Sequence, residues 1–464
     1  MSRLAIVIAG ASVAALVLLT EFAPSPLYVG GAVLMLLAGW MVHEAAGMSP
    51  RRLTIPGIWL VSYLTVAVVP AFFVAADKHT RYVTPYMFAV LSTLVTVPAG
   101  MLLARAATGF SRREVEAFFQ APVVQRTPVP DQTAAYLLVL AISLALTAAY
   151  VIEAPVIPLV HLIRSPGEAA VLVGLREESF KLLDSPLVYV YDVLRRVGYP
   201  FLICVSLGWY LVSRQRRWLV LFLVTAVVGL VYAALTIAKM PVAVIVLVGA
   251  LCWYLHIGGR ISLRAALLGF AAVFLFPVLV LIQSLQGLGV SAELIARGIF
   301  NRLFYLPAEI LYNYFEVVPD VVPYLNGGTI GRLNWALGNE SGVNIANYVF
   351  RYMFPYRLES GMAPGPFVGY LHADFGVVGV LAGGILAGVI LETLQVIVTR
   401  RPKTVVTLAT YAYLLWCGWK LNMESLTQSL LSGGIIIVLG LMELLPATES
   451  FLRIATSRPR LARR

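Results

Sequence analysis

The chain has 464 residues, of which 60% are hydrophobic and 12% are charged. A soluble protein carries about a quarter charged residues, so this composition excludes a soluble globular protein and leaves no room for a separate soluble domain. The net charge of +11 is explained by Lys and Arg in the loops expected inside the cell, where anionic lipid is their expected contact, and no nucleic-acid partner is expected.

The hydropathy pattern predicts an all-α fold, a polytopic bundle of about 12 transmembrane helices that forms a single integral membrane domain over residues 1–464. Each predicted span has about the 20 residues needed to cross roughly 30 Å of hydrocarbon. The first follows a single Arg, and no small-residue cleavage site precedes Glu21, so we expect an uncleaved helix. The predicted spans are 4–20, 27–42, 56–76, 85–104, 133–152, 197–213, 218–237, 241–257, 263–284, 366–397, 404–420 and 429–446.

The basic residues predict the orientation of these spans. Alternate loops carry Lys or Arg at their start, and the C-terminal tail 453–464 is rich in Arg. Lys and Arg accumulate in cytoplasmic loops, so a single orientation satisfies every short loop when both termini are cytoplasmic. The chain is therefore expected to cross the membrane several times, with both termini in the cytoplasm.

Two outer segments, 154–196 and 285–365, are too long to be turns, and we expect interfacial helices in both. In the first, apolar and charged residues interleave over 168–196, as in a helix that lies along the membrane surface. This helix either caps the mouth of the bundle or grips the substrate. The second segment holds the residues that carry most of the chemistry.

The second segment places five arginines on the side of the membrane where basic residues are normally scarce, which predicts an anionic ligand. Guanidinium groups suit phosphates, and the many tyrosines among them suit sugar rings, so a glycan attached to a phosphate would use both. The alternative for 301–316 is an amphipathic interfacial helix with aromatic anchors. On its helical wheel Glu309 shares a face with Tyr312 and Glu316. The arginines are Arg297, Arg302, Arg332, Arg351 and Arg357, and Tyr352 lies between the last two.

Three ionisable residues near the outer ends of spans extend this set. Lys239 lies in a very short outer turn, where it either reaches lipid headgroups or binds a lipid phosphate. His372 and Asp374 lie near the start of span 366–397, where burial of an ionisable group is costly. They are two residues apart, so they point to one cavity only if the helix start is irregular, as 364–366 (Pro-Gly-Pro) favours. The alternative is a bond from one of them to a neighbouring helix.

Other features exclude several chemistries. Cys204, Cys252 and Cys417 fall in separate spans without metal-ligand spacing, and we interpret them as packing residues. The chain lacks a phosphate-cradling glycine loop, a zinc motif, a nucleophile elbow and an Asp-x-Asp pair, so no metal and no cofactor is expected. Glycines at 379, 383, 384 and 388 permit close helix packing. A transporter and an intramembrane transferase remain.

Four motifs carry a resemblance to a known family. They are Lys239-Met240-Pro241, Arg302 with Leu306-Pro307, the stretch from Arg332 to Gly342, and Pro364-Gly365 through Asp374-Phe375-Gly376. Together with the layout of spans and a long outer loop, they resemble the Wzy-type O-antigen polymerases, membrane glycosyltransferases of the GT-C class that join oligosaccharide repeat units. The Arg332–Gly342 interval is one residue shorter than the loop spacing of the family.

The resemblance implies a reaction, its partners and the roles of the site residues. A growing glycan on undecaprenyl pyrophosphate is transferred to the terminal sugar hydroxyl of an incoming lipid-linked repeat unit at the periplasmic face. Membrane lipids, a chain-length regulator and a flippase are the further partners implied. The candidate bases are His372, Asp374 and Glu309, and the substrate-binding set is Lys239, Arg297, Arg302, Arg332, Arg351, Arg357, Tyr352 and Tyr370.

Two other functions stay open at this point. An O-antigen ligase has a similar architecture but transfers the finished glycan to lipid A core. A non-enzymatic exporter of lipid-linked oligosaccharides would show duplicated halves and charges near the midplane of the bilayer. The chain shows no internal repeat, and its ionisable residues gather at the outer ends of spans, which favours the transferase.

Overall fold

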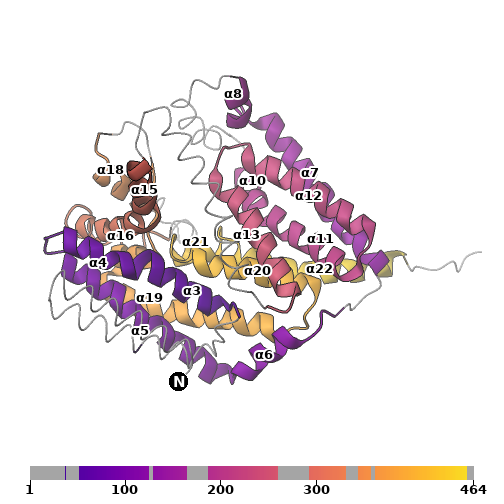
Figure 1. Ribbon diagram of the computed structural model, residues 1–464, viewed down its shortest axis with the longest axis horizontal. Coiled ribbons are helices and arrows are strands. Elements are labelled where there is room, and N and C mark those ends of the chain that lie inside the picture. The colour runs from indigo at the N-terminus through magenta and orange to yellow at the C-terminus, as the bar shows by residue number, and fades with distance from the viewer. Residues whose placement is uncertain are drawn as a thin grey trace, which may run out of the picture. The chain divides into compact units, whose positions relative to one another are not determined.

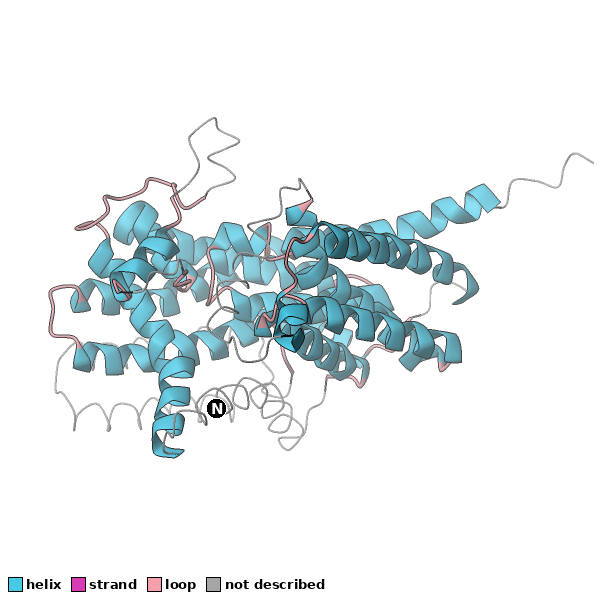
Figure 2. Ribbon diagram, turned by 90° about the horizontal axis from the view of Figure 1, so that it is seen from above, coloured by secondary structure: helices cyan, strands magenta, loops and turns pink. Residues whose placement is uncertain are grey.

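The structure is a computed structural model that describes residue 37 and residues 52–124, 129–164, 187–259, 292–330, 343–356 and 361–456. Over these residues all regular structure is helical, without a strand (Figure 2). Seven helices are long and apolar enough to cross a membrane: Ile55–Asp77, Val83–Thr108, Thr133–Glu153, Val188–Ser213, Arg216–Ala234, Phe367–Thr399 and Leu426–Thr448. An all-helical chain with several potential membrane spans is therefore confirmed, whereas the number of twelve stays a prediction. The predicted spans 4–20 and 263–284 lie outside the described residues, as does 27–42 apart from Leu37.

The described chain divides into two compact units. The first unit contains the helices α3 (Ile55–Tyr63), η1 (Leu64–Val68), α4 (Val69–Asp77), α5 (Val83–Thr108), α15 (Ala292–Phe300), η3 (Asn301–Tyr305), α16 (Leu306–Val317), α18 (Ile345–Met353) and α19 (Phe367–Thr399). The second contains α7 (Val129–Glu153), α8 (Pro158–Arg164), α10 (Val188–Val193), η2 (Leu194–Gly198), α11 (Tyr199–Ser213), α12 (Arg216–Ala234), α13 (Lys239–His256) and α22 (Ile435–Thr456) (Figure 1). Among the described residues, the boundaries between the units fall within α6 (Arg112–Gln120), directly after α19, and within α20 (Val405–Lys420) and α21 (Leu426–Leu430).

Three helices contain a π-turn directly before a proline. The π-turns η1, η2 and η3 end two residues before Pro70, Pro200 and Pro307. In each case the residue before the proline donates its N–H to the carbonyl five residues back, as Leu306 does to Asn301. Proline lacks an N–H, and its ring clashes with the carbonyl four residues back, so the wider turn lets the helix continue where an α-turn would break. Pro307 accordingly lies in the first turn of α16, and the helix continues through it.

The core of the first unit is the close packing of α5 against α19 (Figure 1). A Cβ atom at Gly100 would lie 2.0 Å from the Ile385 carbonyl oxygen, and one at Gly388 would lie 1.9 Å from that of Val97. The backbones approach so closely only because these positions lack side chains, which confirms the packing role expected for the glycines of this span. At one end of this contact Arg105 Nε lies 2.6 Å from the fully buried Glu392.

The predicted span 366–397 is broken near its start. Gly376 has φ 61° and ψ −146°, a conformation that side chains disfavour. A Cβ at Gly383 would lie 2.3 Å from the Leu371 side chain, although a straight helix would separate these residues by about 18 Å along its axis. Residues 367–375 are therefore a short separate segment that packs back onto the helix following Gly376. The irregularity expected at 364–366 is thus found instead after His372 and Asp374.

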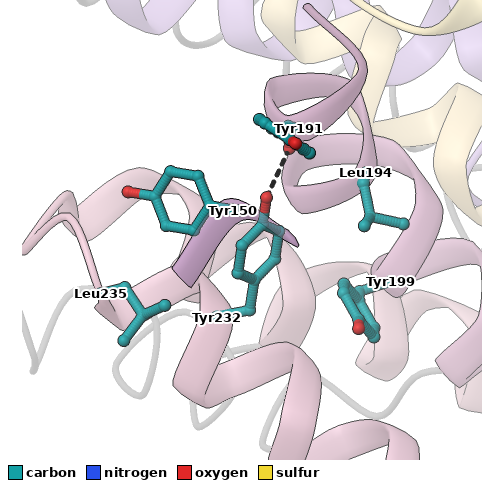
Figure 3. Close-up of a cluster of buried hydrophobic side chains, with 6 residues drawn as sticks. All are labelled: Tyr150, Tyr191, Leu194, Tyr199, Tyr232 and Leu235. Atoms are coloured by element: carbon teal, nitrogen blue, oxygen red, sulfur yellow. Dashed lines mark hydrogen bonds between the residues drawn. The ribbon is translucent and has the colours of Figure 1, made fainter. Parts of the chain in front are cut away.

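The second unit has an aromatic core built on a helix that is longer than predicted. Tyr150, Tyr191, Tyr199 and Tyr232 are buried and meet edge to face, and the Tyr232 hydroxyl donates to the Tyr191 carbonyl (Figure 3). The helix begins at 188 rather than 197. Arg195 and Arg196 therefore lie inside this helix and not before it. Arg195 is accommodated there because it is buried and donates to Thr236 and Asp192.

Candidate functional site

A network of polar side chains joins the turn between α4 and α5 to α16. The Lys78 Nζ atom lies 3.1 Å from Glu309 Oε1, and the Tyr305 hydroxyl donates to Asp77. Tyr312 lies one helical turn after Glu309, and Glu316 lies two turns after it. The Tyr312 hydroxyl donates to Glu316 and accepts from the Thr80 hydroxyl. The face of Glu309, Tyr312 and Glu316 expected from their spacing is therefore the face that contacts this turn.

The same turn is bound a second time by the loop after α16. The carboxylate of Asp320 accepts from the Tyr82 hydroxyl and from the guanidinium of Arg81. These two donors, Tyr82 first, hold the pKa of Asp320 below its ordinary value of 3.8. The predicted outer turn at 77–82 and the predicted outer segment thus meet at one end of the first unit.

Helix α18 presents an aromatic and cationic face beside this network (Figure 1). Its apolar residues Ile345, Ala346 and Val349 are buried, whereas Tyr348, Arg351 and Tyr352 are exposed. Residues three and four apart lie on the same side of a helix, so these three side chains are neighbours. Burial and then the nearby carboxylate of Glu316 on α16 raise the pKa of Tyr352.

The arginines of these elements differ from the other cations in the network. Lys78 and Arg81 each have a carboxylate partner. Arg297, Arg302 and Arg351 are exposed, and none of them has an ion-pair or hydrogen-bond partner among the described residues. Within the described part of the chain, three guanidinium groups on these elements are therefore not neutralised by a carboxylate.

His372 is buried at a different point of this unit. Its ring stacks on Phe315 with centroids 3.9 Å apart, and Nε2–H donates to the Val318 carbonyl at 3.1 Å. The side chain is 4% exposed, and Nδ1 has no partner within the described part of the chain. In this position it fixes the short segment 367–375 to the end of α16.

Asp374 anchors the loop after α16. Its two carboxylate oxygens accept from the backbone N–H and the hydroxyl of Thr329, and its own carbonyl accepts from Asn326 N–H. The residue is 2% exposed. His372 and Asp374 therefore contact different segments, each in the manner of the alternative interpretation, a bond to a neighbouring element.

The other predicted residues are distributed as follows. Tyr370 is 9% exposed and packs edge to face on Tyr314 with centroids 5.3 Å apart. Lys239 is the first residue of α13, directly after the turn that ends α12, and it belongs to the second unit. Arg332 and Arg357 lie outside the described residues.

Several residues of this network did not enter the predicted site. Five of them come from one turn of the first unit, and they are Asp77, Lys78, Thr80, Arg81 and Tyr82. The turn is short, and it carries two basic residues on a side where they are scarce. Two basic residues in so short a turn on the outer side are the sequence signal that could have identified this part of the site.

The arrangement can bind an anion and transfer a proton. Exposed guanidinium groups accept the oxygens of a phosphate, tyrosine faces accept a sugar ring, and the partly exposed Glu309 can take a proton. Within the described ranges no group of three metal-ligating side chains occurs. No family model matches the chain, and neither a curated protein nor a solved structure is significantly similar to it.

Proposed function

We propose that the chain is a membrane glycosyltransferase that polymerises lipid-linked oligosaccharide repeat units. The growing glycan leaves its polyprenyl diphosphate carrier and joins the terminal sugar hydroxyl of an incoming lipid-linked repeat unit. The site consists of the turn 77–82, α15 to α16 and α18, on the predicted outer side of the membrane.

One observation carries the proposal. Arg297, Arg302 and Arg351 are exposed and have no carboxylate partner among the described residues, while tyrosines flank Arg351 on the same face of α18. A guanidinium that is not neutralised within the protein is free to neutralise a ligand. A diphosphate with a glycan attached would use the arginines and the tyrosine faces together.

In the proposed reaction the arginines supply positive charge near the diphosphate, where negative charge develops. When the anomeric C–O bond breaks, its electron pair leaves with the diphosphate, and fixed cations near it lower the barrier. The acceptor hydroxyl must lose its proton to a base. Glu309, whose side chain is 23% exposed, is better placed for that role than His372 and Asp374, which are buried and bonded to other segments.

The test compares alanine variants in the purified enzyme. We expect Arg302→Ala and Arg351→Ala each to lower turnover with a lipid-linked repeat unit by about 100-fold, the cost of removing one such charge from a transition state. Arg113→Ala is the matched control, because Arg113 is also exposed without an ion-pair partner in the described chain but lies on α6, at the predicted inner side.

Two results would overturn the proposal. One is full polymer length in both arginine variants, and the other is an equal loss in Arg113→Ala. A product in which finished polymer is attached to lipid A core would instead identify a ligase. Elongation by detergent-solubilised protein, which has no bilayer to cross, would exclude a carrier.

A further inference from the structure

The ion pair between Lys78 and Glu309 joins two groups that the transfer reaction would use in different ways. Lys78 is a cation in the turn 77–82 of the proposed site, and Glu309 is the carboxylate best placed to act as a base. While they are paired at 3.1 Å, one carboxylate oxygen of Glu309 is engaged by the ammonium group, and the carboxylate competes with any anion for that ammonium group.

The surroundings of Lys78 leave room for a second partner. Its side chain is 32% exposed and that of Glu309 is 23% exposed, so neither group is sealed in the interior. The ammonium nitrogen also lies 6.0 Å from the centre of the Tyr312 ring, and its charge acts on Tyr352 of α18. Lys78 therefore lies near side chains of both α16 and α18.

We infer that Lys78 exchanges Glu309 for the diphosphate of the lipid-linked substrate, and that this exchange frees Glu309 to act as the base. The inference rests on the proposed function, and it adds Lys78 as a substrate-binding and positioning residue. Binding of the substrate then releases the carboxylate of Glu309 from its ion pair, so that both of its oxygens are available to the acceptor hydroxyl only when a diphosphate occupies the site.

The step balances as follows. The acceptor hydroxyl gives its proton to a carboxylate oxygen of Glu309, and its oxygen forms the new bond to the anomeric carbon. The bond from that carbon to the diphosphate oxygen breaks, and its electron pair leaves with the diphosphate. Lys78, released from Glu309, and the neighbouring arginines stabilise the added negative charge.

The test measures binding of farnesyl diphosphate, a short polyprenyl diphosphate, to purified full-length variants. Removing the competing carboxylate in Glu309→Gln should tighten binding by about 2- to 5-fold, as expected for a partly exposed ion pair. Lys78→Ala should weaken binding by about tenfold or more, since a charged hydrogen bond to phosphate is lost. In the double variant Glu309→Gln should no longer tighten binding, because its effect acts through Lys78.

The control is Glu114→Gln, which breaks the Arg400–Glu114 pair at the predicted inner side of the same unit. Glu114→Gln should leave the affinity for farnesyl diphosphate unchanged. If Glu114→Gln tightened binding as much as Glu309→Gln does, the cause would be the net charge of the protein, and the inference would be overturned. Unchanged affinity in Glu309→Gln would also overturn it. If Arg302→Ala still weakens binding in that case, the proposed function survives without the exchange. If the wild type does not bind the probe, the proposed function fails first.

Discussion

Asp320 shows how a single exposed residue can connect two segments of the site. Its carboxylate accepts from Tyr82 and Arg81 and thereby holds the turn 77–82 against the loop after α16. A carboxylate whose pKa is lowered on folding stabilises the folded state above its unfolded pKa and loses that contribution as the pH falls through its folded pKa. The contribution of Asp320 should therefore be complete at pH 7 and decline below about pH 4.

The prediction concerns Asp320→Asn. We expect its melting temperature in detergent to be below that of the wild type at pH 7, and the difference to shrink as the pH is lowered towards 3. Thermal unfolding followed by tryptophan fluorescence at several pH values measures both quantities. A difference that stays constant with pH would show that the charge of Asp320 is not the cause.

His372 and Asp374 show what the sequence reveals at this scale. Their cost in a membrane helix predicts that each has a specific partner, and each does. The partners could not be predicted, because Val318 and Thr329 contribute backbone groups and a hydroxyl that occur throughout the chain. Their spacing along an ideal helix did predict that the two side chains point to different places, because the chain stays helical until Gly376.

At the scale of elements, the contact between α5 and α19 depends on missing side chains. A Cβ at Gly388 would lie 1.9 Å from the Val97 carbonyl oxygen, and that backbone cannot move without moving the whole helix. We predict that Gly388→Ala destabilises the protein by about 1–3 kcal/mol, the usual cost of overpacking. Thermal unfolding in detergent measures this.

Gly440→Ala in α22 is the matched control. Its Cβ would meet no atom within 4 Å in the described structure, and alanine favours a helix, so we expect unchanged or slightly higher stability. Equal destabilisation by both substitutions would contradict the packing argument.

The sequence predicted the glycine contact but not the break in the same helix. Closely spaced glycines indicate a face on which a neighbour can approach, and α5 does approach there. Gly376 is one more glycine in that series, and nothing in the hydropathy pattern distinguishes it, because the residues on both sides are apolar. Its surroundings are tertiary: Tyr324 lies against it, and Leu325 and Asn326 donate to the carbonyls of Ala373 and Asp374 just before it.

At the scale of the whole molecule, hydropathy predicts helices and not their neighbours. The ranges of most described helices were predicted to within a few residues, because about 20 apolar residues in sequence have few other uses. The grouping into two units was not predictable in this way. The first unit joins segments more than 200 residues apart, such as α5 and α19, and their contacts depend on side-chain shape.

The predicted orientation can be tested with single cysteines. Cys204, Cys252 and Cys417 are buried, so the native chain gives a low background with a membrane-impermeant maleimide. Val321→Cys, at an exposed position after α16, should be labelled in spheroplasts. Arg113→Cys, exposed on α6, should be labelled only after permeabilisation. The opposite pattern would place the candidate site in the cytoplasm and exclude the proposed reaction.

The π-turn before Pro307 also sets the rotational phase of the helix that precedes it. Successive residues of an α-helix are about 100° apart, so Arg297 and Glu309 would project about 120° from each other in an uninterrupted helix. A π-turn absorbs one extra residue, which reduces that angle to about 20°. Arg297 therefore projects from nearly the same side as Glu309 because of the proline, and the length of one turn, without any change of charge, determines which side of the helix the cation occupies.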